Sequence, residues 1–113
     1  MDDTCLCIKG EGGADVCCCP IEGIVEVVSR RYALPIIGLI GNHPSLRFKE
    51  IMGHFDNLSP NTLAARLKEL KRYGLVERKS FSEIPPRVEY SLKRKGRELR
   101  EAIKPLMAWA SIQ

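Results

Sequence analysis

Hydrophobic residues recur at helical spacing along most of the chain. From Ile21 to Val28 the apolar positions follow i, i+3, i+4 and i+7, with Glu22 and Glu26 between them. This spacing is typical of a helix with one buried face. The same pattern predicts helices over residues 21–28, about 35–40, 48–55, 59–73 and 99–110.

In three of these helices, a serine, proline or glycine predicts where the helix begins, ends or bends. Ser59 is a suitable N-cap and is followed by Pro60, which fits the first helical position. Gly74 is expected to end the same helix. Pro35 fits the first turn of a short buried helix, and Pro105 is expected to kink the last one.

Between Gly74 and the last helix the hydrophobic period changes from about 3.6 residues to two. Residues 75–81 and 87–92 are strand candidates, and Pro85–Pro86 predicts an extended, exposed loop between them. Helices followed by two such strands and a further helix are the order of a winged helix-turn-helix. The predicted fold is therefore mainly α with a small β-hairpin wing, together with helices for dimerisation.

The helix over residues 59–73 has the properties of a recognition helix. With Leu63, Leu67 and Leu70 turned inward, the opposite face carries polar, small and basic side chains. Small or amide groups there can approach base edges, and longer cations can reach phosphate. That face consists of Asn61, Ala65, Lys68 and Arg72, flanked by Thr62 and Arg66. The alternative is an ordinary solvated helix face.

Charge divides the chain into two parts. Residues 1–28 contain one basic and six acidic residues, a net charge of −5, whereas residues 29–113 contain 17 basic and eight acidic residues, a net charge of +9. The basic part suggests a polyanionic partner. All five cysteines lie in the acidic part, at positions 5, 7, 17, 18 and 19. We therefore expect a Cys-containing acidic arm over residues 1–18 and a single domain over residues 19–113.

Several sequence blocks together resemble one family. They are "CP" at 19–20, "LRFKEI" at 46–51, "LSPNTLAARLKELKRYGLVER" at 58–78, "PPRVEYSL" at 85–92 and "KGRELREAIKPLMAW" at 95–109. This combination closely resembles the HxlR-type branch of the MarR-like winged-helix transcription regulators, from Cys19 to Trp109. The resemblance implies a homodimer that binds a pseudo-palindromic operator in double-stranded DNA.

By this resemblance the first and last helices supply the dimer interface and the hairpin supplies the wing. The apolar surface of the last helix, which exceeds what a small domain easily buries, also favours a dimer. The expected interface residues are Ile21, Ile24, Val28, Leu99, Ile103, Leu106, Met107 and Trp109. The expected DNA contacts are Arg47, Ser59, Asn61, Thr62, Ala65, Arg66, Lys68, Arg72, Lys79, Ser80, Ser82 and Arg87.

In thiol-responsive members of this family, the cysteine before the proline that opens the first helix is the sensor, and Cys19 matches that position. The positive end of that helix favours a thiolate, although Glu22 and Glu26 oppose it. Redox sensing at Cys19, with its neighbours Cys18 and Cys17, is one expectation. A second is a zinc site or iron–sulfur cluster drawn from Cys5, Cys7, Cys17, Cys18 and Cys19, and a third is inert, exposed thiols.

Other classes of function find less support. The sequence contains no G-x-S-x-G motif, no phosphate-binding P-loop and no His-x-x-x-His pair, so we do not expect an enzyme. The longest apolar run, Ala33 to Gly41, is too short to cross a bilayer and no signal peptide precedes it, which predicts a cytoplasmic protein. A winged-helix module that binds protein instead of DNA is the main alternative.

Overall fold

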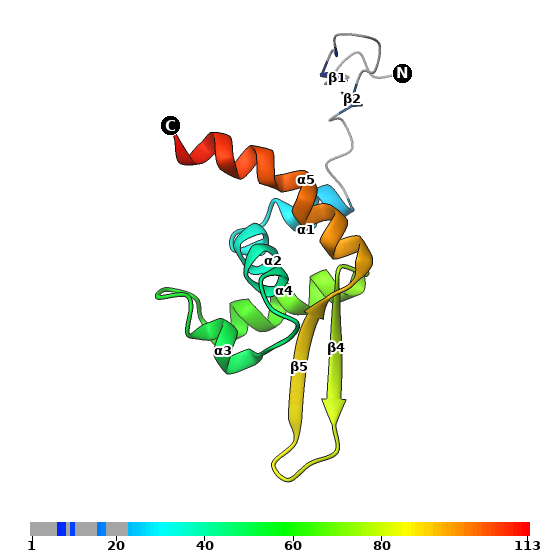
Figure 1. The fold of residues 1–113 in the computed structure, drawn as a ribbon, viewed down its shortest axis with the longest axis vertical. Helices are drawn as coiled ribbons and strands as arrows, with labels where there is room; N and C mark the ends of the chain where they lie inside the picture. Colours follow the sequence, from blue (N-terminus) through cyan, green and yellow to red (C-terminus); the bar gives the residue numbers. More distant parts are fainter. Residues whose placement is uncertain (1–6, 9, 11–15, 18–22) are drawn as a thin grey trace.

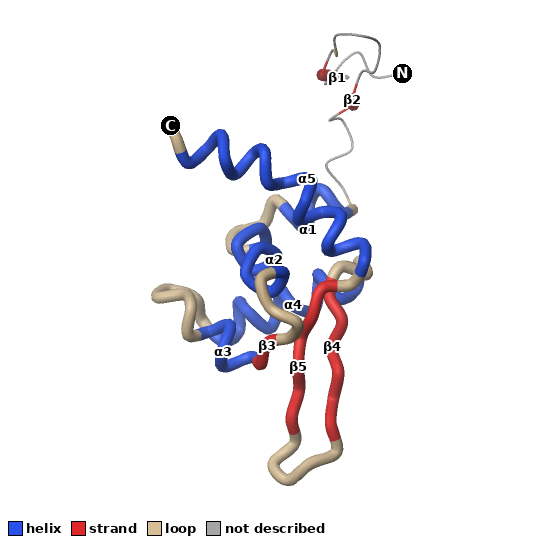
Figure 2. The backbone as a smooth tube through the Cα atoms, viewed as in Figure 1, coloured by secondary structure: helices blue, strands red, loops and turns tan. Residues whose placement is uncertain are grey.

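The computed structural model describes residues 7–8, 10, 16–17 and 23–113 (Figure 1). Along this part of the chain the elements are β1 (Cys7–Ile8), β2 (Val16–Cys17), α1 (Ile24–Val28), α2 (Ala33–Gly41), β3 (Leu46–Arg47), α3 (Phe48–Met52), α4 (Pro60–Arg72), β4 (Val76–Phe81), β5 (Arg87–Leu92) and α5 (Arg94–Ser111). The order of helices, hairpin and final helix confirms the predicted winged helix-turn-helix (Figure 2).

A three-stranded antiparallel sheet has the order β3-β5-β4. In the hairpin, Val76 pairs with Leu92 and Phe81 pairs with Arg87, so the two strands are in register over their full length. On the other side of β5, Leu46 pairs with Tyr90 and Arg47 with Glu89. Strand β3 was not predicted, because two residues are too few to establish a period of two.

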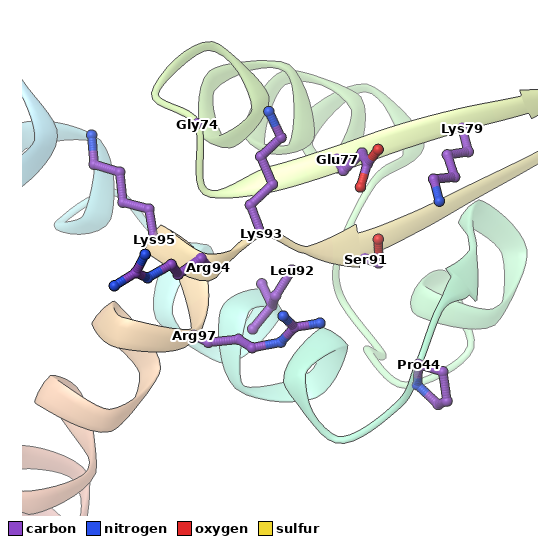
Figure 3. A pocket seen from close by; sticks show the side chains of 10 residues that line it. All are labelled: Pro44, Gly74, Glu77, Lys79, Ser91, Leu92, Lys93, Arg94, Lys95 and Arg97. Atoms are coloured by element: carbon purple, nitrogen blue, oxygen red, sulfur yellow. The ribbon is translucent and has the colours of Figure 1, made fainter.

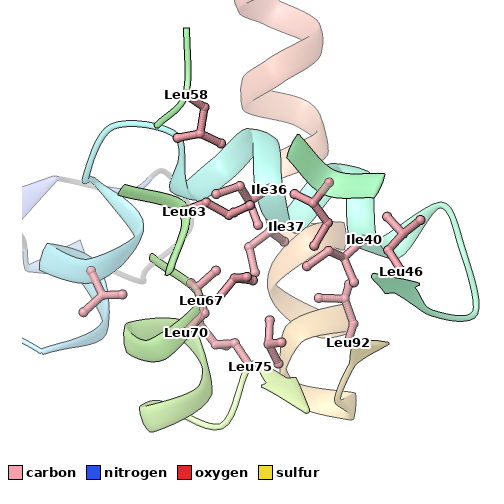
Figure 4. Packing of buried hydrophobic residues seen from close by; sticks show 13 residues of the cluster. Ile36, Ile37, Ile40, Leu46, Leu58, Leu63, Leu67, Leu70, Leu75 and Leu92 are labelled. Carbon is pink, nitrogen blue, oxygen red and sulfur yellow. The ribbon is translucent and has the colours of Figure 1, made fainter. Parts of the chain in front are cut away.

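The hydrophobic core lies between α2, α4 and the base of the sheet (Figure 4). Helix α2 contributes Ile36, Ile37 and Ile40, and α4 contributes Leu63, Leu67 and Leu70. These six side chains are at most 2 % exposed. Leu75, Val76 and Leu92 close the core at the base of the hairpin. The predicted apolar stripe of α4 therefore faces inward, and the positions opposite it are left on the surface.

Local signals at both ends of α4 act as predicted. The Ser59 hydroxyl accepts a hydrogen bond from the backbone N–H of Thr62 at 3.1 Å, and Pro60 occupies the first turn. Gly74 has a φ of +74°, a left-handed conformation that glycine adopts without steric cost, and it turns the chain from α4 into β4.

Two predicted helices are shorter in the structure. Helix α3 ends at Met52, and the backbone N–H groups of His54 and Phe55 bond carbonyls three residues back, as in a tight turn. Helix α1 begins at Ile24, and Ile21 lies outside the described residues.

Helix α5 begins against the base of the hairpin. Its N-cap residue Lys93 donates its backbone N–H to the Leu75 carbonyl at 3.0 Å, and the buried Gly96 lies against the same carbonyl. Pro105 lies inside α5, and Figure 1 shows that the two halves of this helix run in different directions. In the described part of the chain, no helix is long and apolar enough to span a membrane.

Candidate nucleic-acid interface

Helix α4 presents the expected face to solvent. Asn61, Ala65, Lys68 and Arg72 are all exposed, on the side opposite the buried leucines. Thr62 at the edge of this face is half-buried, and its hydroxyl accepts a hydrogen bond from the Ser59 hydroxyl at 2.9 Å. The first turn of α4 is thus held by its own side chains, while Asn61 stays open to solvent.

A hollow of about 240 Å³ lies between α4 and the hairpin. Its lining comprises Ala64, Leu67, Lys68, Lys71, Arg78 and Tyr90. Arg78 and Tyr90 are paired across β4 and β5, so the hairpin places them side by side at the edge of the helix. In the described part of the chain, Lys68, Lys71 and Arg78 form no ion pair with a carboxylate. As far as the described residues show, three cations therefore surround one hollow without a carboxylate partner.

The hairpin loop projects away from the helices, as a wing does (Figure 1). Lys79, Ser80 and Ser82 are exposed along it. The Ser80 hydroxyl accepts a hydrogen bond from Nη1 of Arg78 at 3.2 Å, which steadies both side chains. Arg47 in β3 is exposed as well, and its backbone N–H is bound by Glu50 at 2.8 Å, which starts α3.

The guanidinium of Arg87, a predicted DNA contact, has partners within its own hairpin. Nη2 lies 3.3 Å from Glu83 and Nε lies 3.4 Å from Glu89, while the group stacks over Phe81 at 4.2 Å from the ring centroid. The Nε atom is buried and its separation from Glu89 is an ion pair without hydrogen-bond geometry. Arg87 therefore stabilises the wing, and its contact with DNA stays a prediction.

Arg66, also a predicted DNA contact at the edge of the exposed face, is likewise bound within its own chain. Its Nε donates to the Arg31 carbonyl at 2.9 Å and its Nη1 pairs with Glu69 at 2.7 Å. The side chain is only 19 % exposed. The guanidinium therefore joins Glu69 of its own helix to the connection between α1 and α2, and its contact with DNA stays a prediction.

Residues 30–32, between α1 and α2, contact both α4 and the turn that precedes it. Arg30 pairs with Glu69 of α4 at 2.8 Å. Tyr32 donates its hydroxyl to the Asn57 carbonyl at 3.3 Å and packs edge-on against Phe55, 5.9 Å between ring centroids. Tyr32 adopts a φ of +73°, which is strained for a residue with a Cβ. This segment therefore fixes both α4 and the turn before it.

A second, larger hollow of about 620 Å³ lies where the hairpin meets α5 (Figure 3). Its lining includes Lys79, Lys93, Arg94, Lys95 and Arg97, with Glu77 as the acidic member. Figure 3 shows that these long side chains fan outward in different directions. They raise the positive potential of this side of the molecule but do not converge on one point.

The predicted dimer residues divide into two groups. Ile24, Val28, Leu99 and Ile103 are partly buried against the core of their own chain. Leu106, Met107 and Trp109 in the second half of α5 are 53 %, 45 % and 60 % exposed. Ile112 continues this apolar surface, and Val25 on α1 is also exposed. Apolar area of this kind on one helix is typical of a protein–protein contact.

The cysteines are described only in part. Cys7 and Cys17 lie in β1 and β2, which pair antiparallel, whereas Cys5, Cys18 and Cys19 lie outside the described residues. Within the described residues, no group of three or more His, Cys, Asp or Glu side chains could hold a metal ion. The predicted sensor Cys19 and three of the five predicted metal ligands therefore lie outside the described residues.

The fold and this surface together define a winged helix-turn-helix transcription regulator. The family model for the HxlR-like helix-turn-helix matches residues 27–113, and the chain belongs to this family. The family and the relatives below are regulators of transcription, not enzymes.

Two relatives from Bacillus subtilis show the similarity in sequence. The HTH-type transcriptional regulator YvaP is 39 % identical over 94 residues, covering 82 % of this chain and 86 % of YvaP. The HTH-type transcriptional regulator YodB is 37 % identical over 93 residues, covering 81 % of this chain and 82 % of YodB.

Solved structures show the same fold. A possible HxlR family transcriptional factor from Thermoplasma volcanium superposes with a TM-score of 0.84 at 27 % identity, covering 96 % of both chains. The reduced form of B. subtilis YodB gives a TM-score of 0.71 at 34 % identity, covering 82 % of this chain and 90 % of that one. The redox regulator HypR in its oxidised form gives 0.76 at 26 % identity, covering 84 % of this chain and 97 % of that one.

Sequence reasoning missed Lys71, Arg78 and Tyr90 as parts of the surface, and the ion pair between Arg30 and Glu69. Lys71 lies three residues after Lys68, so helical spacing was a usable signal for it. Arg78 and Tyr90 lie next to α4 because of the pairing of β4 with β5, which no local sequence pattern predicts. Arg30 and Glu69 are 39 residues apart, and no local pattern connects them.

Proposed function

We propose that this transcription regulator acts as a homodimer that binds an operator in double-stranded DNA, with α4 in the major groove and the hairpin on the flanking backbone. The observation that carries the proposal is the hollow between α4 and the wing, surrounded by Lys68, Lys71 and Arg78. Unpaired cations in one hollow repel each other, so a polyanion that enters between them gains attraction and relieves that repulsion.

The shape of the hollow favours a phosphate of the DNA backbone. It opens between a helix that can enter a groove and a hairpin that can follow the strand beside it. Tyr90 at its wall carries a hydroxyl that can donate a hydrogen bond to a phosphate oxygen. Phosphate contacts at this place would fix the depth and rotation of α4, and base edges would then be read by Asn61, Thr62 and Ala65.

Arg72 at the end of α4 and Lys79, Ser80, Ser82 and Arg47 extend the proposed contact surface. Lys79, Ser80 and Ser82 follow the exposed part of the wing. Ser59 caps α4, and its role is to hold the first turn toward the DNA, where the partial positive charge of the helix end favours phosphate.

The dimer is supported by the exposed apolar end of α5. Leu106, Met107 and Trp109 lie on the half of the helix that leaves its own domain after Pro105. Burying such side chains against a second copy removes apolar area from water, which is favourable. A two-fold dimer would present two α4 helices to successive major grooves, about 34 Å apart.

We further propose that oxidation of the N-terminal cysteines regulates DNA affinity. Two kinds of relatives support this: YodB, which has been solved in a reduced and a diamide-treated form, and the redox regulator HypR. The alternative is a zinc site or iron–sulfur cluster on the same cysteines. Thiolate ligands serve both chemistries, so metal content distinguishes them.

The test of DNA binding is an affinity measurement against salt concentration, with operator sequences selected from a random duplex library. We expect the logarithm of the association constant to fall linearly with the logarithm of salt concentration. Arg78→Ala should weaken binding and lower the magnitude of that slope by about one. Lys104→Ala is the matched control, because Lys104 lies on α5 and pairs with Glu101 at 2.8 Å.

A protein that selects no sequence and shows weak, salt-insensitive DNA affinity would overturn the proposal. That result would favour a winged-helix module that binds another protein. If Arg78→Ala and Lys104→Ala had equal effects on DNA affinity, the hollow would not be a phosphate-binding site. The proposal that the protein binds DNA would still stand.

A further inference from the structure

The short hairpin formed by β1 and β2 brings two cysteines to the same position. In its antiparallel register Cys7 is paired with Cys17 and Ile8 with Val16. The two cysteines are ten residues apart along the chain, and they are the only cysteines among the described residues. The backbone therefore places Cys7 and Cys17 directly opposite each other on the two strands.

The backbone spacing of such a pair suits a disulfide. Directly opposed residues of an antiparallel ladder have Cα atoms about 4.5 or 5.5 Å apart, depending on whether the pair is hydrogen-bonded. Disulfides span Cα separations of about 4.4–6.8 Å. Both kinds of pair fall inside this window, so the bond would form without separating the strands.

We propose that Cys7 and Cys17 are the redox pair of the N-terminal segment and form an intramolecular disulfide on oxidation. Each thiol loses a proton and one electron, and the two sulfur atoms join. An oxidant such as diamide accepts the two electrons and two protons and becomes the corresponding hydrazine. A thiol reductant reverses the step through a mixed disulfide.

Other pairings are disfavoured by chemistry. Cys17, Cys18 and Cys19 are consecutive, and a disulfide between adjacent residues is strained. Cys5 and Cys7 are separated by a single residue, so neither group supplies an unstrained pair by itself. One bond between the two groups is the simplest unstrained product, and the register selects Cys7 and Cys17 for it.

The pair stands close to α1 in the chain. Gly23 follows Cys17 by six residues, and α1 leads directly to Arg30, which pairs with Glu69 of α4 at 2.8 Å. This consequence rests on the proposed function: the disulfide lies on the segment before α1, and Arg30 and Glu69 link the residues after α1 to the helix that contacts DNA, so oxidation should change DNA affinity.

Peptide mapping of the full chain tests the pair directly. The reduced protein, purified without chelator, is treated with diamide, its free thiols are blocked and it is digested with trypsin. Cleavage after Lys9 and Arg30 puts Cys5 and Cys7 on one peptide and Cys17, Cys18 and Cys19 on another. We expect the two peptides to be linked, fragment spectra to place the bond at Cys7–Cys17, and the chain to stay monomeric on a non-reducing gel.

Single variants complete the test. The link should be lost in Cys7→Ser and Cys17→Ser and kept in Cys5→Ser, Cys18→Ser and Cys19→Ser. A link between other cysteines, a bond between two chains, no disulfide, or stoichiometric zinc or iron that protects the thiols would each overturn the proposal.

The oxidised and reduced proteins are then compared for DNA affinity. We expect oxidation to change the affinity of the wild type and of Cys5→Ser, and to leave Cys7→Ser unchanged. A full response in Cys7→Ser would refute the pair as a switch. If the wild type binds no DNA in either state, the proposed function fails, while the mapped bond decides the pairing independently.

Discussion

Arg30 and Glu69 form an ion pair between the connection of α1 and α2 and the last turn of α4, with Nε of Arg30 2.8 Å from Oε2 of Glu69. The other carboxylate oxygen of Glu69 binds Arg66 at 2.7 Å, and Arg66 donates in turn to the Arg31 carbonyl. One carboxylate thus holds two arginines. Because one of them belongs to the connection and the other to α4, the network fixes the rotation of the helix.

Replacing Glu69 by Gln should loosen this arrangement. The amide keeps the size of the side chain but loses both charge pairs. Since the groups are partly exposed, we expect the free energy of unfolding to fall by only about 1 kcal/mol. DNA affinity should fall several-fold although Glu69 is not itself a proposed DNA contact. Denaturant unfolding and fluorescence anisotropy measure the two effects.

Glu101→Gln is the control for this substitution. Glu101 pairs with Lys104 at 2.8 Å on the surface of α5, and that lysine lowers the pKa of the Glu101 carboxyl. This pair joins two residues of one helix, so its loss should change neither stability nor DNA affinity measurably. Equal effects of the two substitutions would show that Glu69 does not position α4.

Arg66 and Arg72 should respond differently to alanine substitution. Arg66 is held by Glu69 and the Arg31 carbonyl, so Arg66→Ala should lower the thermal midpoint. Arg72 is exposed at the end of α4, so Arg72→Ala should leave that midpoint unchanged and weaken DNA binding. Thermal denaturation and anisotropy on the same samples separate the two roles. An Arg66→Ala protein of full stability would contradict the structural role assigned to this residue.

Trp109→Glu should disrupt the proposed dimer. Trp109 is 60 % exposed in the single chain, and a carboxylate in its place would be desolvated by a second copy. We expect sedimentation to show a monomer and circular dichroism to show unchanged helix content. Ile84→Glu is the control, because Ile84 at the wing tip is equally apolar and fully exposed. A Trp109→Glu protein that remains dimeric would place the interface elsewhere.

Gly96 and Gly38 offer a matched pair of helical glycines. A Cβ at Gly96 would collide with the Leu75 carbonyl, which must then shift, whereas a Cβ at Gly38 meets nothing within 4 Å. We expect Gly96→Ala to cost about 1–3 kcal/mol of stability. Gly38→Ala should be neutral or stabilise by up to about 1 kcal/mol because alanine favours the helix. Denaturant unfolding of both variants checks the difference, and a stable Gly96→Ala protein would contradict the close approach.

The sequence predicts the parts of this fold that depend on local periodicity. Helix α4 follows from three leucines at helical spacing, a serine–proline start and a glycine stop, and the structure confirms each signal. The hairpin follows from alternation in residues 87–92 and two prolines in its loop. These features need no knowledge of distant residues.

The sequence does not reveal the intramolecular partners of Arg66 and Arg87, because these partners are distant in the chain or are brought together by the hairpin. Helical geometry places Arg66 near the exposed face, but its length lets it reach Arg31, 35 residues earlier in the chain. Arg87 alternates outward as expected, yet the hairpin register and the loop bring Phe81, Glu83 and Glu89 around it. The period of hydrophobic residues, two in a strand or 3.6 in a helix, predicts which way a side chain points. It does not predict which distant residues a long side chain contacts.

The junction between β4 and α5 has a consequence for the geometry of DNA recognition. The Leu75 carbonyl binds the start of α5 and touches Gly96, so the hairpin and the long helix share a rigid base. In a dimer built on α5, the crossing angle of the two α5 helices would therefore determine the separation of the two wings. Substitutions far from any DNA contact, at the end of α5, would then change the half-site spacing that the protein prefers.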